Sequence, residues 1–496
     1  AISKKYAADI EKHKKIFVAG CEKNDIPVKA AEAIYGDIEF FARYGFNKCL
    51  PGDVEVVDAV SGRLVRVEDL YTGEASLTET ITCDTASLKL QSGRVSAVME
   101  NGVKPVYRLT TRMGRQIEAT ANHPFYTFDG WRRLEELGVG DQIATPRRLP
   151  VEGQAEWPEH QVIALGHLLA EGNLCHPKKT EIPAAAFELN NRQIALLLSR
   201  MWEGDGHINQ QGRSLFYATA SERMARQMQH LFLRLGIVSR LRTVEFPYKE
   251  GRTGYQLFVT GNDNIEQFAA TVGCHFVSQR RRERLDALRL EAPQANGTRD
   301  VVPLGVKELV RKAKAAAGVT WQEMNAVSGV AQREFYPTGN PGKSGFTRET
   351  VGRLADYFGS AKLRRYADND IFWDQVESIE YVGEKQTYDL EVPGTHNFVA
   401  NDILVHNSHA ADYAVITVQT AYLKALYPVE YMAALLLVER DKTDKVVNFI
   451  NECRRMGIQV LPPDINYSGL DFEKQAVPAD SAQLALNKDP GLQFAF

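Results

Sequence analysis

Two junctions constrain this chain more than any other feature, because the texture of the sequence changes at Cys49 and changes back after Asn407. Removing residues 49–407 joins the flanks, so that Tyr44-Gly45-Phe46-Asn47-Lys48 runs into Ser408-His409-Ala410-Ala411-Asp412-Tyr413 as one uninterrupted stretch. Insertions survive where the chain of a host domain is exposed. The sequence therefore predicts a host that carries an inserted element, with reactive residue types at both junctions.

Composition excludes several classes. A length of 496 residues suffices for several domains, and a net charge of −4 gives no global positive charge for nucleic acid or membrane binding. The six cysteines form no C-x-x-C pair, which favours reduced thiols in a cytoplasmic protein over disulfides or structural zinc. No apolar run reaches the roughly 18 residues of a spanning helix. We expect a cytoplasmic protein with no membrane partner. Both termini of the sequence are expected to be the ends of a fragment.

The periodicity of apolar residues divides the chain into successive segments. It predicts helices at 1–48, short strands at 49–150, a mixed α and β domain at 161–290, helices at 304–360, strands again at 375–407, and helices at 408–496. Asn101-Gly102 and Asn401-Asp402 are expected to be turns between strands. Nesting explains the order: a mixed domain interrupts a β domain, which itself interrupts a helical host.

The residue types at the junctions suit self-excision. The thiol of Cys49 can attack the carbonyl of Lys48 through a five-membered ring, which converts an amide into a thioester. Ser408 can then take the acyl group as an ester. The side-chain nitrogen of Asn407 can attack its own carbonyl, forming a succinimide and cutting the Asn407–Ser408 bond. An O-to-N shift would finally restore an amide between Lys48 and Ser408.

Further residues are expected to assist these steps. Thr120 and His123 follow a predicted strand at 116–119, and together they could donate to the amide at Cys49, twisting it and protonating its nitrogen. His406 directly precedes Asn407 and can polarise its carbonyl.

Asp389 and His396 lie close to these positions in the sequence and are expected to reach the same site.

Taken in order, these motifs resemble inteins, the Hint (hedgehog/intein) family. The matching segments are Cys49-Leu50-Pro51-Gly52-Asp53, Thr120-x-x-His123, Tyr388-Asp389 with His396-Asn397-Phe398, and Val405-His406-Asn407-Ser408. The resemblance covers 49 to about 150 and about 375 to 407, and it implies an all-β splicing fold that needs no cofactor. It implies these catalytic roles: Cys49 as first nucleophile, Thr120 and His123 activating its amide, Asp389 coordinating the steps, His396 and His406 assisting cyclisation, Asn407 cyclising, and Ser408 accepting the acyl group.

One departure from a uniform scheme is that a thiol starts the reaction and a hydroxyl accepts it, so the thioester-to-ester step is expected to be slow. A hedgehog-type autoprocessor is disfavoured, because it would need neither Asn407 nor a C-terminal partner.

The flanks resemble the alpha subunit of bacterial DNA polymerase III, a replicative C-family polymerase. The resemblance rests on Phe40 to Lys48 joined to Ser408 to Tyr413, and on Gln419 to Lys424, Tyr427 to Met432 and Leu461 to Asn466. It implies DNA and other replicative polymerase subunits as partners. The metal-binding aspartates of that family lie upstream of this region, so this segment is not expected to polymerise DNA by itself.

Within the insertion, Leu165 to Gly172 and Leu198 to Gly206 resemble the paired LAGLIDADG helices of homing endonucleases. The resemblance implies close helix packing and two acids, Glu171 and Asp205, that would share Mg²⁺ over DNA if the domain is active. These acids are only 34 positions apart, too few for a complete half-domain between them. We therefore expect a degenerate endonuclease domain.

Two further segments are read as possible nucleic-acid contacts. The basic residues Arg280, Arg281, Arg282 and Arg284 are candidates for phosphate binding, although such a run is also typical of a solvated helix face. Residues 304–360 are expected to form either a helix-turn-helix DNA reader or a small helical spacer.

The fold class expected overall is multi-domain: an all-β Hint domain with an inserted α+β LAGLIDADG-like domain and a small helical segment, flanked by helical polymerase segments. The function expected is a self-splicing precursor. Two alternatives stay open, namely an active site-specific DNA endonuclease and a nucleic-acid-binding polymerase module with an inert insert.

Overall fold

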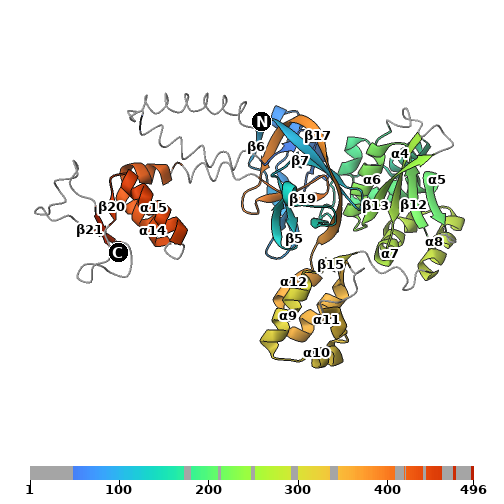
Figure 1. Ribbon diagram of the computed structural model, residues 1–496. Helices are drawn as coiled ribbons and strands as arrows, with labels where there is room; N and C mark the ends of the chain where they lie inside the picture. The colour runs from blue at the N-terminus through green and yellow to red at the C-terminus, as the bar shows by residue number, and fades with distance from the viewer. Residues whose placement is uncertain are drawn as a thin grey trace, which may run out of the picture. The chain divides into compact units, whose positions relative to one another are not determined.

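The computed structural model describes residue 29 and residues 48–171, 180–209, 214–246, 252–291, 300–335, 344–407, 418, 420–438, 443–460, 473–475 and 493–495. By its internal contacts the chain divides into a unit of residues 47–408 and a unit made of residues 1–46 with 409–496 (Figure 1). The helices expected within 1–48, apart from Lys29, and the acceptor Ser408 lie outside the described residues.

The larger unit is built on an antiparallel sheet that alternates segments from both ends of the insertion. Its strand order is β3-β2-β18-β19-β8-β10-β17-β6-β7, with β1 on β17 and β9 on β8. The strands are β1 (Leu50–Pro51), β2 (Glu55–Val57), β3 (Leu64–Arg66), β6 (Ala97–Thr111), β7 (Gln116–Thr120), β8 (Pro124–Thr127), β9 (Gly130–Arg133), β10 (Gln142–Pro146), β17 (Ile371–Glu391), β18 (Asn397–Ala400) and β19 (Ile403–His406). A hairpin of β4 (Glu79–Asp84) and β5 (Lys89–Arg94), a short helix α3 (Val67–Thr72) and the turn η1 (Leu134–Glu136) complete this β domain. The domain is therefore β-rich rather than strictly all-β.

Strands β6 and β17 are long and pair along most of their length, with irregularities in the register. The prediction that Asn101-Gly102 ends a strand is wrong. Gln386 pairs with Val103 while Tyr388 pairs with Glu100, so the dipeptide forms a bulge inside β6. Pairing with β17 carries the strand across this point, and Gly102 adopts the bulge at a φ of 73°.

The hairpin of β18 and β19 confirms the other predicted turn. Asn401 and Asp402 have φ values of 46° and 60°, the left-handed pair that a two-residue hairpin loop needs. The hairpin is buried on its apolar side, where Phe398, Ile403 and Val405 have no exposed surface. The turn therefore fixes the direction in which the chain reaches Asn407.

The first inserted part combines one sheet with helices. The sheet order is β11-β12-β14-β13, from β11 (Gly206–Asn209), β12 (Ser214–Thr219), β13 (Ser239–Phe246) and β14 (Arg252–Val259). The helices are α4 (Glu159–Glu171), α5 (Asn191–Asp205), α6 (Glu222–Arg234), α7 (Asn262–Thr271) and α8 (Gln279–Glu291), with the short turns η3 (Ala184–Glu188) and η5 (Gly273–His275). Side-chain caps start two of the helices, because Asn190 accepts the backbone N–H of Gln193 and Ser221 accepts that of Met224.

The second inserted part is helical and follows its cap signals closely. It contains β15 (Val301–Pro303), α9 (Val306–Ala317), α10 (Trp321–Ser328), η6 (Gln332–Phe335), β16 (Gly345–Thr347), α11 (Arg348–Phe358) and α12 (Ala361–Ala367). Thr320 and Glu323 form a capping box at α10, while Gly318 and Gly329 end α9 and α10 in the left-handed conformation. This helical part packs on the β domain through aromatic rings. Phe128 of the β domain, for example, stacks on Tyr366 with 4.5 Å between the ring centroids.

The described residues of the smaller unit form their own small core. They include α14 (Pro428–Val438), α15 (Thr443–Arg455) and a sheet of β20 (Gln459–Val460), β22 (Gln493–Ala495) and β21 (Glu473–Gln475). Val429, Met432, Leu436 and Cys453 are buried in it. Among the helices that the structure describes, none is long and apolar enough to cross a membrane.

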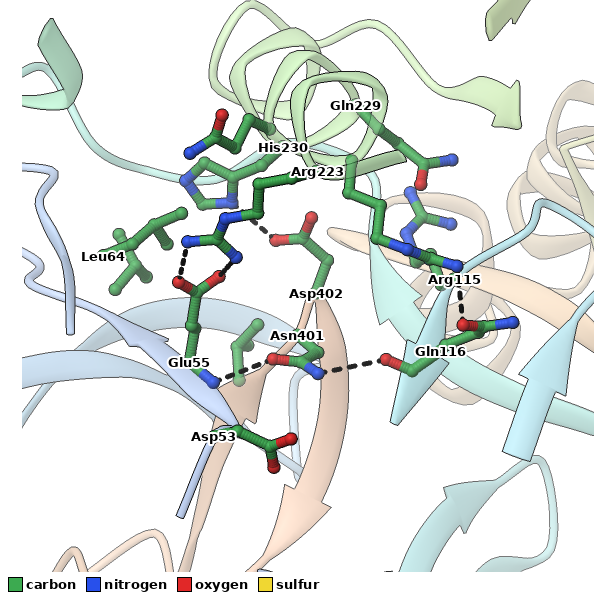
Figure 2. Close-up of a pocket in the computed structure, with 14 residues that line it drawn as sticks. Asp53, Glu55, Leu64, Arg115, Gln116, Arg223, Gln229, His230, Asn401 and Asp402 are labelled. Atoms are coloured by element: carbon green, nitrogen blue, oxygen red, sulfur yellow. Dashed lines mark hydrogen bonds and ion pairs between the residues drawn. The ribbon is translucent and has the colours of Figure 1, made fainter. Parts of the chain in front are cut away.

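Helix α6 of the inserted part contacts the turn that leads to Asn407 (Figure 2). Arg223 forms a two-pronged ion pair with Glu55, whose backbone N–H donates to Asn401 Oδ1 at 2.8 Å. His230 Nδ1 lies 2.8 Å from Asp402 Oδ1, and both side chains are largely buried. The inserted part therefore holds both residues of the β18–β19 turn in place.

The Asp402 carboxyl titrates under opposing influences. Burial raises its pKa, but the charge and hydrogen bond of His230, helped by the charge of Arg115, outweigh burial and lower the pKa overall. A carboxyl whose folded pKa is lowered stabilises the fold above its unfolded pKa of about 3.9 and loses that contribution as the pH falls through the folded pKa. At neutral pH the Asp402 carboxyl is therefore ionised.

We predict that His230→Leu lowers the free energy of unfolding by about 1–3 kcal/mol at pH 7, because Asp402 loses its buried partner. The measurement is chemical unfolding in a Cys49→Ala, Asn407→Ala background that keeps the chain intact. The loss should shrink as the pH falls from about 4, the pKa of the unfolded carboxyl, through the lower pKa of folded Asp402. His160→Leu, on the exposed start of α4, is the control, and an equal loss in both variants would contradict the account.

Candidate active site at the two junctions

The amide that joins Lys48 to Cys49 is held by Thr120 at the end of β7. The backbone N–H of Cys49 donates to Thr120 Oγ1 at 3.1 Å, and the backbone N–H of Thr120 donates to the Cys49 carbonyl at 3.1 Å. Cys49 has no exposed surface and Thr120 has 4 %. The Thr120 hydroxyl accepts the amide hydrogen of Cys49 and donates to the Cys49 carbonyl at 3.4 Å, so it orients the amide directly.

His123 is fully buried in the loop between β7 and β8, and neither ring nitrogen has a hydrogen-bond partner among the residues that the structure describes. Burial, followed by the charges of His406 and Lys48, lowers the pKa of His123 to about 3. The ring is therefore neutral at physiological pH. A neutral ring still carries one N–H for hydrogen bonding. The pKa of His123 is affected by a residue of each junction, since Lys48 belongs to one junction and His406 to the other.

At the second junction, the ring of His406 lies against the scissile carbonyl. His406 Nδ1 is 2.5 Å from the carbonyl oxygen of Asn407. A carbonyl oxygen can only accept, so Nδ1 carries the proton and polarises the carbonyl. The ring of Trp131 meets the His406 ring edge to face at 4.6 Å between centroids, which fixes the orientation of the imidazole.

Asn407 is completely buried beside that carbonyl. Its Nδ2 donates to the Val392 carbonyl at 3.2 Å, and its backbone N–H donates to the His396 carbonyl at 3.0 Å. Within the described part of the chain, the buried Oδ1 atom has no hydrogen-bond partner. The side-chain nitrogen that would attack is therefore held by an acceptor. Burial keeps water from Asn407, where hydrolysis would compete with cyclisation.

The remaining two predicted site residues lie at different junctions. His396, with a φ of 55°, accepts the backbone N–H of Asn407 through its backbone carbonyl. Asp389 is buried in β17, and its charge raises the pKa of the Cys49 thiol. The structure thus places His396 at the C-terminal junction and Asp389 at the N-terminal one.

Three side chains at the site were missed by sequence reasoning. Lys104 Nζ lies 3.0 Å from Cys49 Sγ, Thr387 donates a hydrogen bond that lowers the Cys49 pKa, and Trp131 packs on His406. None belongs to a local motif, because each reaches the site through strand pairing. Lys104 and Thr387 lie next to the bulge in the pairing of β6 with β17. In the sequence, the Asn101-Gly102 dipeptide is the sign of this bulge.

The inserted part brings Glu171 and Asp205 near each other at the ends of α4 and α5. The helices approach closely, since a Cβ on Gly166 would lie 2.5 Å from Arg200 Cβ, and one on Gly204 would lie 2.5 Å from Ala170 Cβ. Burial raises the Asp205 pKa, with a smaller rise from the charge of Glu171. Among the described residues no group of three or more His, Cys, Asp or Glu could hold a metal ion.

The predicted basic run lies on α8, and its members differ. Arg280 and Arg282 are exposed and Arg284 is half-buried. Arg281 turns inward, donating to the carbonyls of Gly206 at 2.6 Å and Glu203 at 2.8 Å. The guanidinium of Arg281 thereby satisfies carbonyls at the C-terminal end of α5, and a DNA contact by the run stays a prediction.

The geometry of both junctions defines an autoprocessing site, in which a buried thiol and a buried amide flank a shared loop. A sequence profile described as "Intein splicing domain" matches residues 58–407. The chain therefore belongs to the intein splicing-domain family. Splicing of this kind uses the side chains of the chain itself and needs no cofactor.

Similar proteins carry several different names. A replicative DNA helicase DnaB of Rhodothermus marinus is 32 % identical over 447 residues, which are 74 % of this chain and 46 % of that protein. A DNA polymerase III subunit alpha of Thermus aquaticus is 59 % identical over 68 residues, 14 % of this chain and 6 % of that protein. A DnaB intein structure from Synechocystis sp. PCC 6803 aligns with 18 % identity over 73 % of this chain and 99 % of that chain, at a TM-score of 0.27. The chain spans about half the length of the helicases it matches.

We predict that His406→Ala slows cleavage after Asn407 by about 100-fold, because the carbonyl loses its polarising donor. The rate is measured by mass spectrometry of the released C-terminal segment in a Cys49→Ala background. Thioester formation at Cys49, measured in the Asn407→Ala background, should stay within about threefold of its parent, since His406 does not touch that bond. Equal slowing at both junctions would contradict this assignment.

A second prediction concerns the protonation state of His123. Its ring should remain neutral down to about pH 4, because the folded pKa is about 3. NMR of ring-labelled histidine in the Cys49→Ala, Asn407→Ala variant, assigned by His123→Phe, measures this directly. Titration of the His123 ring near its ordinary pKa of about 6.5 would contradict the buried position.

Proposed function

We propose that this chain is a self-splicing precursor that excises residues 49–407 and joins Lys48 to Ser408. The observation that carries the proposal is that one β domain holds both junctions: Thr120 accepts the backbone N–H of Cys49, and His406 contacts the carbonyl oxygen of Asn407. Such an arrangement supports coupled chemistry at two junctions that are far apart in sequence.

The first two steps transfer the N-terminal segment. Cys49 Sγ attacks the Lys48 carbonyl carbon, the C–N bond breaks, and the Cys49 nitrogen becomes a free amine while a thioester forms. Thr120, which accepts the hydrogen of this amide, orients the bond for attack. The Ser408 hydroxyl then displaces the thiol and takes the acyl group as an ester. Ser408 lies outside the described residues, so its part rests on the chemistry of the junction.

The last two steps release the element. Asn407 Nδ2 attacks its own carbonyl carbon, the bond to Ser408 breaks, and a succinimide forms at the end of the excised segment. His406 Nδ1–H is placed to stabilise the oxygen of that carbonyl as its charge grows. The freed Ser408 amine then attacks the ester, and an ordinary amide joins the two flanks.

We propose further that the flanks belong to a DNA polymerase III alpha subunit. Support comes from the short segment that is 59 % identical to the Thermus aquaticus protein, and from one that is 58 % identical to the Deinococcus radiodurans protein. Relatives named as helicase and as RecA align with 74 % and 73 % of this chain, which fits an element shared by unrelated hosts. DNA and other polymerase subunits are the partners proposed for the host.

Intact mass after expression tests the splicing proposal. With 55.5 kDa over 496 residues, excision of the 359 residues from 49 to 407 should yield products of roughly 40 and 15 kDa. Cys49→Ala should stop cleavage at the first junction, and Asn407→Ala should stop release at the second. A single 55.5 kDa species that stays unchanged with time under folding conditions would contradict the proposal.

For the inserted part we propose descent from a LAGLIDADG endonuclease without cutting activity. The close approach of α4 and α5 at Gly166 and Gly204 supports the descent. Between these helices the described residues contain only η3, whereas α5 is followed by a full sheet with its helices. Only one DNA-facing half would then be present, with two acids and the Arg281 guanidinium at its centre.

DNA that contains the uninterrupted host gene should accordingly stay intact with the protein and Mg²⁺. The measurement is gel analysis over a range of protein concentrations, with a Cys49→Ala, Asn407→Ala variant that keeps the insertion in place. Double-strand cutting that disappears in Asp205→Asn would contradict this proposal and establish the endonuclease alternative.

The helical part at 300–367 is proposed as a spacer. Its inner face shares one core with the splicing sheet, where Val302 and Phe346 pack in the same cluster as Tyr126 and Trp373. This packing favours a structural role over a free DNA reader.

A further inference from the structure

Lys104 is a buried cation in contact with the first nucleophile. Its Nζ lies 3.0 Å from Cys49 Sγ, and its residue is only 4 % exposed. A buried ammonium is costly unless an anion or a strong acceptor faces it. The side chain that Lys104 faces at this distance is the thiol, which becomes an anion when it loses its proton.

Lys385 on the neighbouring strand shows that the contact with Cys49 is specific to Lys104. Lys385 of β17 pairs directly with Lys104 of β6, and like charges in such a pair repel. The ammonium of Lys385 instead forms ion pairs with Glu118 at 2.6 Å and Asp53 at 3.2 Å. The two lysines therefore serve different partners, and only Lys104 is directed to Cys49.

The electrostatics of Cys49 agree with this geometry. Burial raises the pKa of the thiol, and among the groups around it Lys104 lowers the pKa most, by its charge and by a hydrogen bond. Asp389 adds to the rise, while a hydrogen bond from Thr387 opposes it. Lys104 and Thr387 thus oppose the effects of burial and of the Asp389 carboxylate on the thiol.

We propose that Lys104 is a catalytic residue of the first acyl shift, whose ammonium stabilises the Cys49 thiolate that attacks the Lys48 carbonyl carbon. The S–H bond of Cys49 breaks, a C–S bond to Lys48 forms, and the C–N bond of the amide breaks. The proton lost from sulfur is balanced by the proton gained at the Cys49 amine. Lys104 keeps its charge throughout, so the step involves no oxidation and no external reactant.

This inference rests on the proposed splicing function, and one experiment separates the two. The background is Asn407→Ala with Ser408→Ala, which stops the reaction at the thioester. Hydroxylamine at a saturating concentration cleaves the thioester, and mass spectrometry follows the release of residues 1–48 between pH 6 and pH 9. Comparison of variants at the same pH cancels the pH dependence of the trapping reagent.

Lys104→Met should slow release by about 10- to 100-fold near pH 6, and the deficit should shrink as the pH rises, because the thiol then ionises without help. Lys385→Met, which removes the paired lysine of the same sheet, is the matched control and should keep the pH dependence of the parent. Lys104→Arg should also keep it, since the positive charge remains.

The inference is overturned by a Lys104→Met variant that matches its parent, or that is slowed equally at every pH, as a purely structural defect would be. A shift in Lys104→Arg as large as that in Lys104→Met would overturn it as well. If the background with Lys104 intact forms no thioester at any pH, the proposed function itself fails. If that background reacts and only the lysine effect is missing, the function stands and the inference does not.

Discussion

Pairing between β6 and β17 is the interaction on which this architecture depends. The two strands come from opposite sides of the inserted domains, yet their register runs from Val376 with Thr111 to Glu391 with Ala97. This ladder unites the two halves of the splicing sheet across more than two hundred residues of intervening chain. Because β1 pairs with the end of β17, Cys49 is brought to the same sheet that delivers Asn407. Losing the ladder would separate the junctions.

Burial of both junctions has a consequence for the chemistry. Cys49, His123 and Asn407 are each without exposed surface, so water does not compete with the side chains for the acyl carbons. The same burial makes the Cys49 thiol harder to ionise and keeps the His123 ring neutral. A dry site of this kind needs fixed local charges and dipoles. The Lys104 ammonium and the His406 N–H supply such groups, one at each junction.

Much of this arrangement was predictable from local sequence, and the reasons are physical. Hairpin chemistry at Asn401-Asp402 and the segment before Thr120 gave the correct strands, because turn geometry and period-two patterning act within a few residues. Contacts across the fold were not predictable. Lys104 meets Cys49 across 55 positions through a bulge, and the Asn101-Gly102 dipeptide that forms the bulge was read as a turn. The sequence made Arg281 a candidate phosphate ligand. It does not show that the guanidinium donates to a carbonyl at the C-terminal end of α5.

The central claim is that the two junctions meet at one site, and a disulfide tests it most directly. In an Asn407→Ala, Ser408→Cys variant under mild oxidation, a bond between Cys49 and the residue at position 408 requires their Cα atoms to come within about 7 Å. Peptide mapping by mass spectrometry identifies the linked cysteines. The account predicts one dominant 49–408 link formed within single molecules. Linkage of either position mainly to other cysteines, or only between molecules, would contradict it.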